Sequence, residues 1–134
     1  MTEIPKSLID QIREGNVVLF LGAGALKGAI HRDGKPALTG PQLGQLIAEK
    51  FLEEDFSDSS LQIISEVAMS DTGLFPVQQF IAEYFDGFEP ADFHKKIPLY
   101  RWQTIVTTNY DLVIEKAYSQ CSNPKTNHCQ ICKR

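Results

Sequence analysis

Cysteine is absent from the chain before Cys121, and positively charged residues are outnumbered by acidic ones. A disulfide framework distributes its cysteines over the whole fold, so cysteines confined to one end argue against such a framework. No apolar run approaches the roughly 18 residues that a membrane span requires. The N-terminus has neither the basic region nor the apolar core of a signal peptide. We therefore expect a cytoplasmic protein.

The balance of charged residues indicates which classes of binding partner are to be expected. With 13 Lys and Arg against 17 Asp and Glu, the formal net charge is −4. Nucleic acids and membrane surfaces select proteins with a basic face, so we expect neither as a partner. A length of 134 residues allows one domain at most. The apolar share of 43% is ordinary for a globular chain with a hydrophobic core.

The central feature is an unbroken apolar run at 17–21 that leads directly into a glycine-containing turn at Gly22, Ala23, Gly24 and Ala25. A short apolar run that ends at glycine is typical of a strand buried on both faces in a parallel sheet. Glycine allows a sharp turn and close approach of a ligand, and the first amides of a following helix can bind phosphate. The run therefore suggests a nucleotide site at the carboxyl end of a parallel strand.

The glycine spacing leaves two interpretations open. Gly22, Gly24 and Gly28 form G-x-G-x-x-x-G, which is one residue longer than the dinucleotide-binding fingerprint. The P-loop pattern also fails, because Gly34-Lys35 is followed by proline. The turn is either a phosphate-binding loop or an ordinary tight connection between a strand and a helix.

Four helices are predicted between this strand and a second one at 102–107, after a loop at 26–38. They form a helical insertion over about 39–97. Thr39 and Gln42 have the spacing of a capping box at its start, and Asp58 or Ser59 can cap the next helix. We interpret His94, in the last of these helices, as a packing or hydrogen-bonding residue. A further helix is predicted at 5–14.

Polar residues follow the second strand: Thr107, Thr108, Asn109, Tyr110 and Asp111. The carboxyl ends of parallel strands lie at one edge of a sheet, so this segment and residues 22–25 are expected to lie close together. An amide and a carboxylate there suit ribose hydroxyls or a positioned water. Alternatively, the two side chains only shape a turn and cap the last helix.

In this order, the two strand-end motifs resemble those of the sirtuin-like NAD-binding domain. The chain is most similar to the bacterial branch of sirtuin-like NAD hydrolases, many of which belong to antiphage defence systems. That branch has a helical insertion that opens near a Pro-x-x-x-Gly region, similar to residues 34–44, and a His-x7-Trp stretch similar to His94–Trp102. The resemblance covers roughly residues 12–118 and implies a Rossmann-like parallel α/β sheet, here incomplete.

The resemblance also implies roles for particular residues. The loop at 22–25 would hold the pyrophosphate of NAD⁺ through backbone amides. Asn109 would position the attacking water and is the candidate catalytic residue, while Asp111 would support the nicotinamide or ribose. Thr107 and Thr108 would contact the ligand. The reaction would break the bond between nicotinamide and ribose through an oxocarbenium-like state, which fixed dipoles stabilise.

Three departures from the family are visible. Leu26 stands where many relatives have serine. The family's histidine base lies beyond the second motif, where His128 is the only candidate in this chain. The family domain is about twice as long, so we expect residues 1–118 to form only the N-terminal portion of such a domain. Residues 119–134 are expected to form an irregular tail that contains the cysteines.

The tail also offers an alternative metal site. The residues Cys121, His128, Cys129 and Cys132 are zinc ligands by type. However, the sirtuin zinc site uses two separated C-x-x-C pairs, and only one pair occurs here. We expect no metal site, and consider an unrelated end of a truncated gene product the simpler interpretation.

The sequence thus favours an NAD⁺ glycohydrolase whose site is completed by more chain or by a partner. The alternative is an inactive module that binds NAD⁺ or ADP-ribose, or pairs with a second copy or a full-length relative. An NAD-dependent protein deacylase is a third option, for which the sequence shows no acyl-lysine channel.

Overall fold

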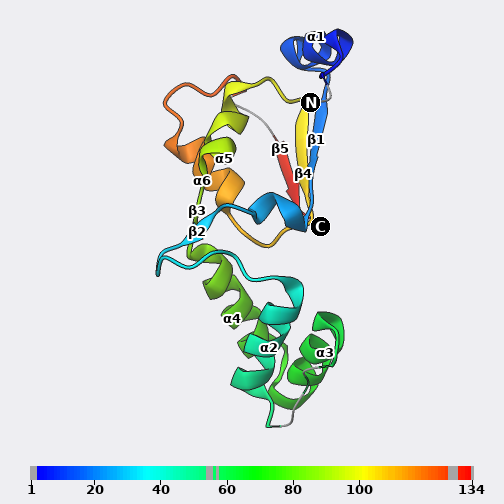
Figure 1. The fold of residues 1–134 in the computed structure, drawn as a ribbon, viewed down its shortest axis with the longest axis vertical. Coiled ribbons are helices and arrows are strands. Elements are labelled where there is room, and N and C mark those ends of the chain that lie inside the picture. The colour runs from blue at the N-terminus through cyan, green and yellow to red at the C-terminus, as the bar shows by residue number, and fades with distance from the viewer. Residues whose placement is uncertain (1–2, 54–55, 57, 127–129, 134) are drawn as a thin grey trace.

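The computed structural model describes residues 3–53, 56, 58–126 and 130–133, and its fold is mixed α/β. Figure 1 shows an elongated molecule with a small parallel sheet towards one end and a group of helices at the other. The elements are α1 (Lys6–Glu14), β1 (Val18–Leu21), the 3₁₀ helix η1 (Ala23–Leu26), β2 (Ile30–His31), α2 (Gly40–Phe51), α3 (Leu61–Thr72), α4 (Leu74–Asp86), β3 (Phe88–Glu89), α5 (Asp92–Lys96), the 3₁₀ helix η2 (Ile97–Leu99), β4 (Thr104–Thr107), α6 (Val113–Gln120) and β5 (Gln130–Lys133).

The main sheet contains β1, β4 and β5 in that order, with all neighbours parallel. Val18 lies opposite Thr104 and Leu21 lies opposite Thr107, so β1 and β4 end at the same level. The helices α5 and α6 lie along one face of this sheet (Figure 1). Ile97, Ile105 and Ile114 form the buried core between them. The prediction of a parallel sheet is confirmed, whereas the described residues do not build a full Rossmann fold.

The prediction that residues 17–21 are buried on both faces is wrong. Val18 and Phe20 are 51% and 64% exposed, while Leu19 and Leu21 pack against the core beneath α5 and α6. In the part of the chain that the structure describes, helices cover only one face of the sheet (Figure 1). The apolar run led to an overestimate of burial, because the sequence does not show which face of the strand packs against other elements.

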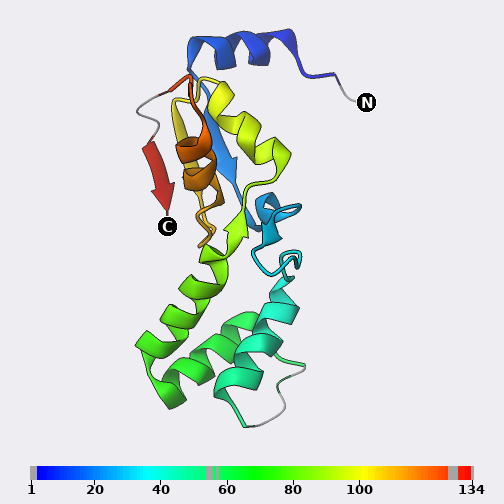
Figure 2. The same cartoon turned by 90° about the vertical axis from the view of Figure 1, so that its left-hand side faces the viewer.

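Residues 26–38 were predicted to be a loop, but they contain β2, which pairs antiparallel with β3. His31 lies opposite Phe88, on the far side of the helical insertion in sequence. We call this pair of short strands the neck, because the insertion joins the rest of the molecule there (Figure 2). Lys116 of α6 binds the neck by donating to the carbonyl oxygen of Phe88 at 2.9 Å.

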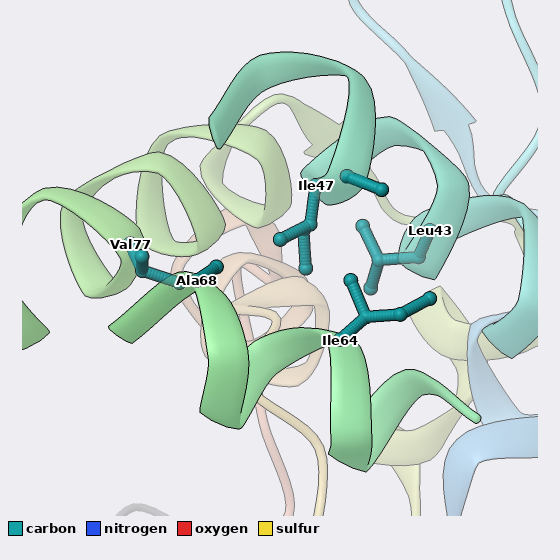
Figure 3. Packing of buried hydrophobic residues seen from close by; sticks show 6 residues of the cluster. Leu43, Ile47, Ile64, Ala68 and Val77 are labelled. Atoms are coloured by element: carbon teal, nitrogen blue, oxygen red, sulfur yellow. The ribbon is translucent and has the colours of Figure 1, made fainter. Parts of the chain in front are cut away.

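The insertion consists of α2, α3 and α4 around a core of its own. Figure 3 shows side chains from all three helices pointing into one shared space. The buried residues are Leu43, Ile47, Ala48, Ile64, Ala68 and Val77. Gly44 allows α2 and α3 to approach closely, since a β-carbon there would lie 3.1 Å from Ile64 Cδ1. The predicted helices are confirmed, although Ser60, and neither Asp58 nor Ser59, caps α3.

The segment 119–134 was predicted to be irregular, yet it ends in β5, which pairs parallel with β4. Ile131 lies opposite Ile105, and Cys132 lies opposite Val106. A strand of four residues is too short to show a clear alternation of apolar and polar positions, so it was not predicted from the sequence. None of the helices in the described ranges has the length and apolar character that a membrane crossing requires.

Candidate functional site at the strand ends

The loops that follow β1 and β4 meet at one edge of the sheet, as predicted. The Thr108 amide donates to the carbonyl oxygen of Leu21 at 3.3 Å, continuing the strand pairing past the last register position. The Asn109 side chain then donates from Nδ2 to the carbonyl oxygen of Gly22 at 3.0 Å. This bond joins the two predicted motifs directly, although they are 87 residues apart in sequence.

Thr107 and Asp111 shape the second loop from within. Thr107 is buried, and its Oγ1 accepts a hydrogen bond from the Asn109 amide at 3.0 Å. Asp111 is also buried, and its Oδ1 accepts from the Val113 amide at 3.0 Å, where α6 begins. Asp111 thus shapes the turn before α6, as the alternative interpretation expected, although Leu112 and not Asp111 occupies the N-cap position. Thr107 thus holds the backbone of Asn109, while Asp111 holds the turn that leads into α6.

A cleft of about 650 Å³ lies between these loops and the insertion. Its volume is within the range of pockets for small molecules. The sheet side contributes Ala23, Leu26, Thr108, Asn109, Tyr110 and Asp111. The insertion side and the segment before it contribute Leu38, Gly40, Leu43, Ile47, Leu61, Gln62, Ser65, Met69, Gln78, Ile81, Ala82 and Phe85.

The lining of the cleft is largely apolar, with a few amide and hydroxyl groups. Among the lining residues that the structure describes, Asp111 is the only carboxylate, and none is lysine, arginine or histidine. A phosphate in this cleft would therefore depend on backbone amides. The cleft suits a ligand with flat or apolar parts that also offers hydrogen-bonding groups.

The first loop continues into η1, a single turn of 3₁₀ helix. Gly22 and Gly24 have open space where a β-carbon would lie. The initial amides of such a turn have no partner within it and can bind a ligand. Of the four predicted binding residues 22–25, Ala23 lines the cleft and Ala25 contacts His94. This geometry is compatible with both the phosphate-binding loop and the simple connection.

His94 ties α5 to the first loop. The ring is 1% exposed, its Nδ1 accepts from the Ala91 amide at 2.9 Å, and its Nε2 lies 2.6 Å from the carbonyl oxygen of Ala25. These partners select the neutral tautomer in which Nε2 carries the proton. Burial lowers the pKa of His94, opposed by the bond to Ala25 and the nearby charge of Asp111. The interpretation of His94 as a packing and hydrogen-bonding residue is confirmed.

The insertion contributes polar residues to the cleft that were not predicted as site residues. Gln62 and Ser65 lie on α3, and Gln78 lies on α4. Gln62, Ser65 and Met69 are spaced by three and four residues, so they share a face of α3. That spacing was visible in the sequence, but only the fold shows that this face lies opposite Asn109.

The predicted base and metal ligands of the tail fall largely beyond this site. His128 and Cys129 lie outside the described residues. Cys121 is a half-buried free cysteine at the end of α6, and Cys132 lies in β5. The described residues contain no group of three or more His, Cys, Asp or Glu side chains that could hold a metal ion.

Comparison with known proteins adds no family assignment. No family model matches the chain, and no curated protein matches it either. The functional inference therefore depends on the residues and geometry of the strand-end cleft.

Proposed function

We propose that this chain is a sirtuin-like NAD⁺-binding domain that hydrolyses NAD⁺ to nicotinamide and ADP-ribose. The observation that carries the proposal is the hydrogen bond between Asn109 Nδ2 and the Gly22 carbonyl at the wall of the cleft. It places an amide side chain beside the turn whose free amides suit a pyrophosphate. The proposal extends to the bacterial antiphage role and the cytoplasmic location expected from the sequence.

The chemistry needs few groups. Water attacks the ribose carbon that bears nicotinamide, the glycosidic bond breaks, and nicotinamide leaves with the bonding electron pair. The attacking water loses a proton to a base or to solvent. With Nδ2 committed to Gly22, the Asn109 Oδ1 is available to accept a hydrogen bond from that water. The Asp111 carboxylate supplies negative charge near the developing oxocarbenium ion.

A specific observation favours the second candidate, a module that binds NAD⁺ or ADP-ribose without turnover. Asn109 and Asp111 each make a hydrogen bond within the fold, and no histidine is among the described residues that line the cleft. Such a module would act by pairing with a second copy or a full-length relative. A protein deacylase would in addition require the cleft to admit an acyl-lysine.

Detection of nicotinamide after incubation with NAD⁺ tests the proposal. We expect release by the wild-type chain, and a loss of about a hundredfold or more in Asn109→Ala, because the positioned water loses its acceptor. The matched control is Asn123→Ala, which removes an exposed asparagine outside the cleft. Circular dichroism of both variants checks that each retains the fold.

The remaining outcomes separate the candidates. Thermal stabilisation by NAD⁺ without nicotinamide release, weakened in Asn109→Ala, supports the binding module and contradicts the hydrolase. Neither release nor stabilisation contradicts both. Equal release by wild type and Asn109→Ala assigns the activity to other residues and overturns the role given to Asn109.

A further inference from the structure

A second hollow lies at the opposite end of the sheet, where β1 and β4 begin. It has a volume of about 440 Å³ and is lined by Ile12, Arg13, Leu99, Tyr100, Arg101 and Lys125. Three of these six residues are cationic and none is acidic. The chain as a whole carries a net charge of −4, so this grouping runs against the overall charge balance. We call it the basic hollow.

The backbone around the basic hollow is held by several contacts. The Lys125 amide donates to the carbonyl oxygen of Pro98 at 2.8 Å, which fixes the segment after α6 against η2. A β-carbon on Gly15 would lie 3.8 Å from Arg101 Cβ, so the base of the Arg101 side chain packs over the end of α1. Three separate parts of the chain thus bring their cations to one place.

Internal ion pairs account for little of this positive charge. In the described ranges, Arg13 makes one pair, with Asp10 at 3.5 Å, and no ion pair is found for Arg101 or Lys125. The C-terminal end of α1 attracts cations, but its partial charge is about half a unit. That charge does not balance three cations, so the basic hollow keeps a net positive charge.

We propose that the basic hollow binds a small molecule that carries two or more phosphate groups, such as a nucleoside polyphosphate. Arginine and lysine bind phosphate oxygens through charge-assisted hydrogen bonds. Tyr100 and Leu99, each 50% exposed, offer an apolar surface beside the cations for a flat organic group. The volume is that of a small-molecule site. This site is independent of the strand-end cleft and of the function proposed for it.

Trp102 provides a direct readout. It is the single tryptophan of the chain, and its ring lies 6.0 Å from the Tyr100 ring, between centroids. Titrations with ATP, inorganic pyrophosphate and adenosine, followed by tryptophan fluorescence and by calorimetry, measure binding. We expect ATP to bind more tightly than pyrophosphate, adenosine to bind weakest, and the affinity for ATP to fall as salt is raised.

The decisive variant is Arg101→Gln combined with Lys125→Gln. We expect it to weaken ATP binding about tenfold or more, since two charge-assisted contacts are lost. The matched control is Lys95→Gln combined with Lys96→Gln, which removes the same charge from two exposed lysines of α5. Asn109→Ala is the second control and should leave this binding unchanged, which separates the basic hollow from the cleft.

Several results would overturn the proposal. An equal loss of ATP affinity in the α5 control would show that ATP is attracted by the overall charge alone. Equal binding of adenosine and ATP would exclude phosphate recognition, and equal binding of pyrophosphate and ATP would exclude the role of Tyr100. A loss in Asn109→Ala as large as in the double variant would place the ATP in the strand-end cleft.

Discussion

The His31 side chain occupies the space that a β-carbon at Gly87 would need. Its Nε2 atom lies 1.9 Å from that position, although the Gly87 backbone is in an ordinary right-handed conformation. The ring stacks on Tyr84 with centroids 5.8 Å apart and meets the edge of Phe88 at 5.1 Å. Glycine is therefore required here by packing, because no unusual φ angle demands it.

Gly87→Ala should destabilise the protein by about 1–3 kcal/mol, as expected for overpacking at a site whose neighbours are held in place. Urea denaturation measures the change. In Gly40→Ala the added carbon meets open space, so little or no loss is expected. Without the His31 ring the added carbon meets no clash. Gly87→Ala should therefore cost less stability in a His31→Ala background than it does in the wild-type protein. A Gly87→Ala protein as stable as wild type would show that the ring moves aside freely.

His94 makes stability depend on pH in a defined direction. Burial lowers its pKa in the folded state, so the unfolded chain takes up a proton more readily as pH falls through about 6.5. Its contribution to stability is therefore present above that pH and declines below it. His94→Gln should show a smaller loss of unfolding free energy between pH 8 and pH 5.5 than wild type. Equal losses in the two proteins would contradict this assignment.

At the scale of elements, the start of α2 depends on one side chain. Gln42 Oε1 accepts hydrogen bonds from both the amide and the hydroxyl of Thr39, at 2.9 and 3.0 Å. These contacts satisfy the chain just before the helix, where backbone groups lack helical partners. The start of α2 also lines the cleft at Gly40 and Leu43. The cap thus helps to define one wall of the candidate site.

Gln42→Ala should cost about 1 kcal/mol, the usual range for loss of a helix cap. Gln45→Ala, at an exposed position of the same helix, makes the same chemical change without loss of the cap and should cost little. Chemical denaturation of both variants gives the comparison. Equal destabilisation would indicate that the capping contacts contribute nothing measurable.

At the scale of the whole molecule, the sheet and the insertion have separate cores. Ile105, Ile97 and Ile114 form one, whereas Ile47 and its neighbours form the other. Phe88, Val113, Leu26 and Ala29 form a third small cluster at the neck. The cleft lies between the two larger cores, so its shape depends on how the neck holds them.

Ile47→Ala should therefore loosen the insertion more than the sheet. Removal of this fully buried side chain costs about 2–5 kcal/mol. We expect hydrogen exchange to increase in α2, α3 and α4, with smaller changes in β1 and β4. Ile105→Ala, also fully buried, should give the opposite distribution. The same uniform increase in both variants would show that the two cores unfold as one unit.

The sequence alone predicted the features that depend on neighbouring residues. The helices, the capping box at Thr39 and the two strands were evident from residue spacing and type. The proximity of residues 22–25 and Asn109 was also predictable, because parallel strands end at a common edge.

Only the tertiary structure decided the features that depend on distant partners. It exposed Phe20, paired β2 with β3 across the insertion and added β5 to the sheet. It also placed His94 on the Ala25 carbonyl, and set Gln62 and Ser65 opposite Asn109. The physical reason is the distance along the sequence over which each kind of interaction acts. Capping and helical periodicity act over a few residues, whereas strand pairing and burial are settled by whichever surfaces meet after the chain has folded.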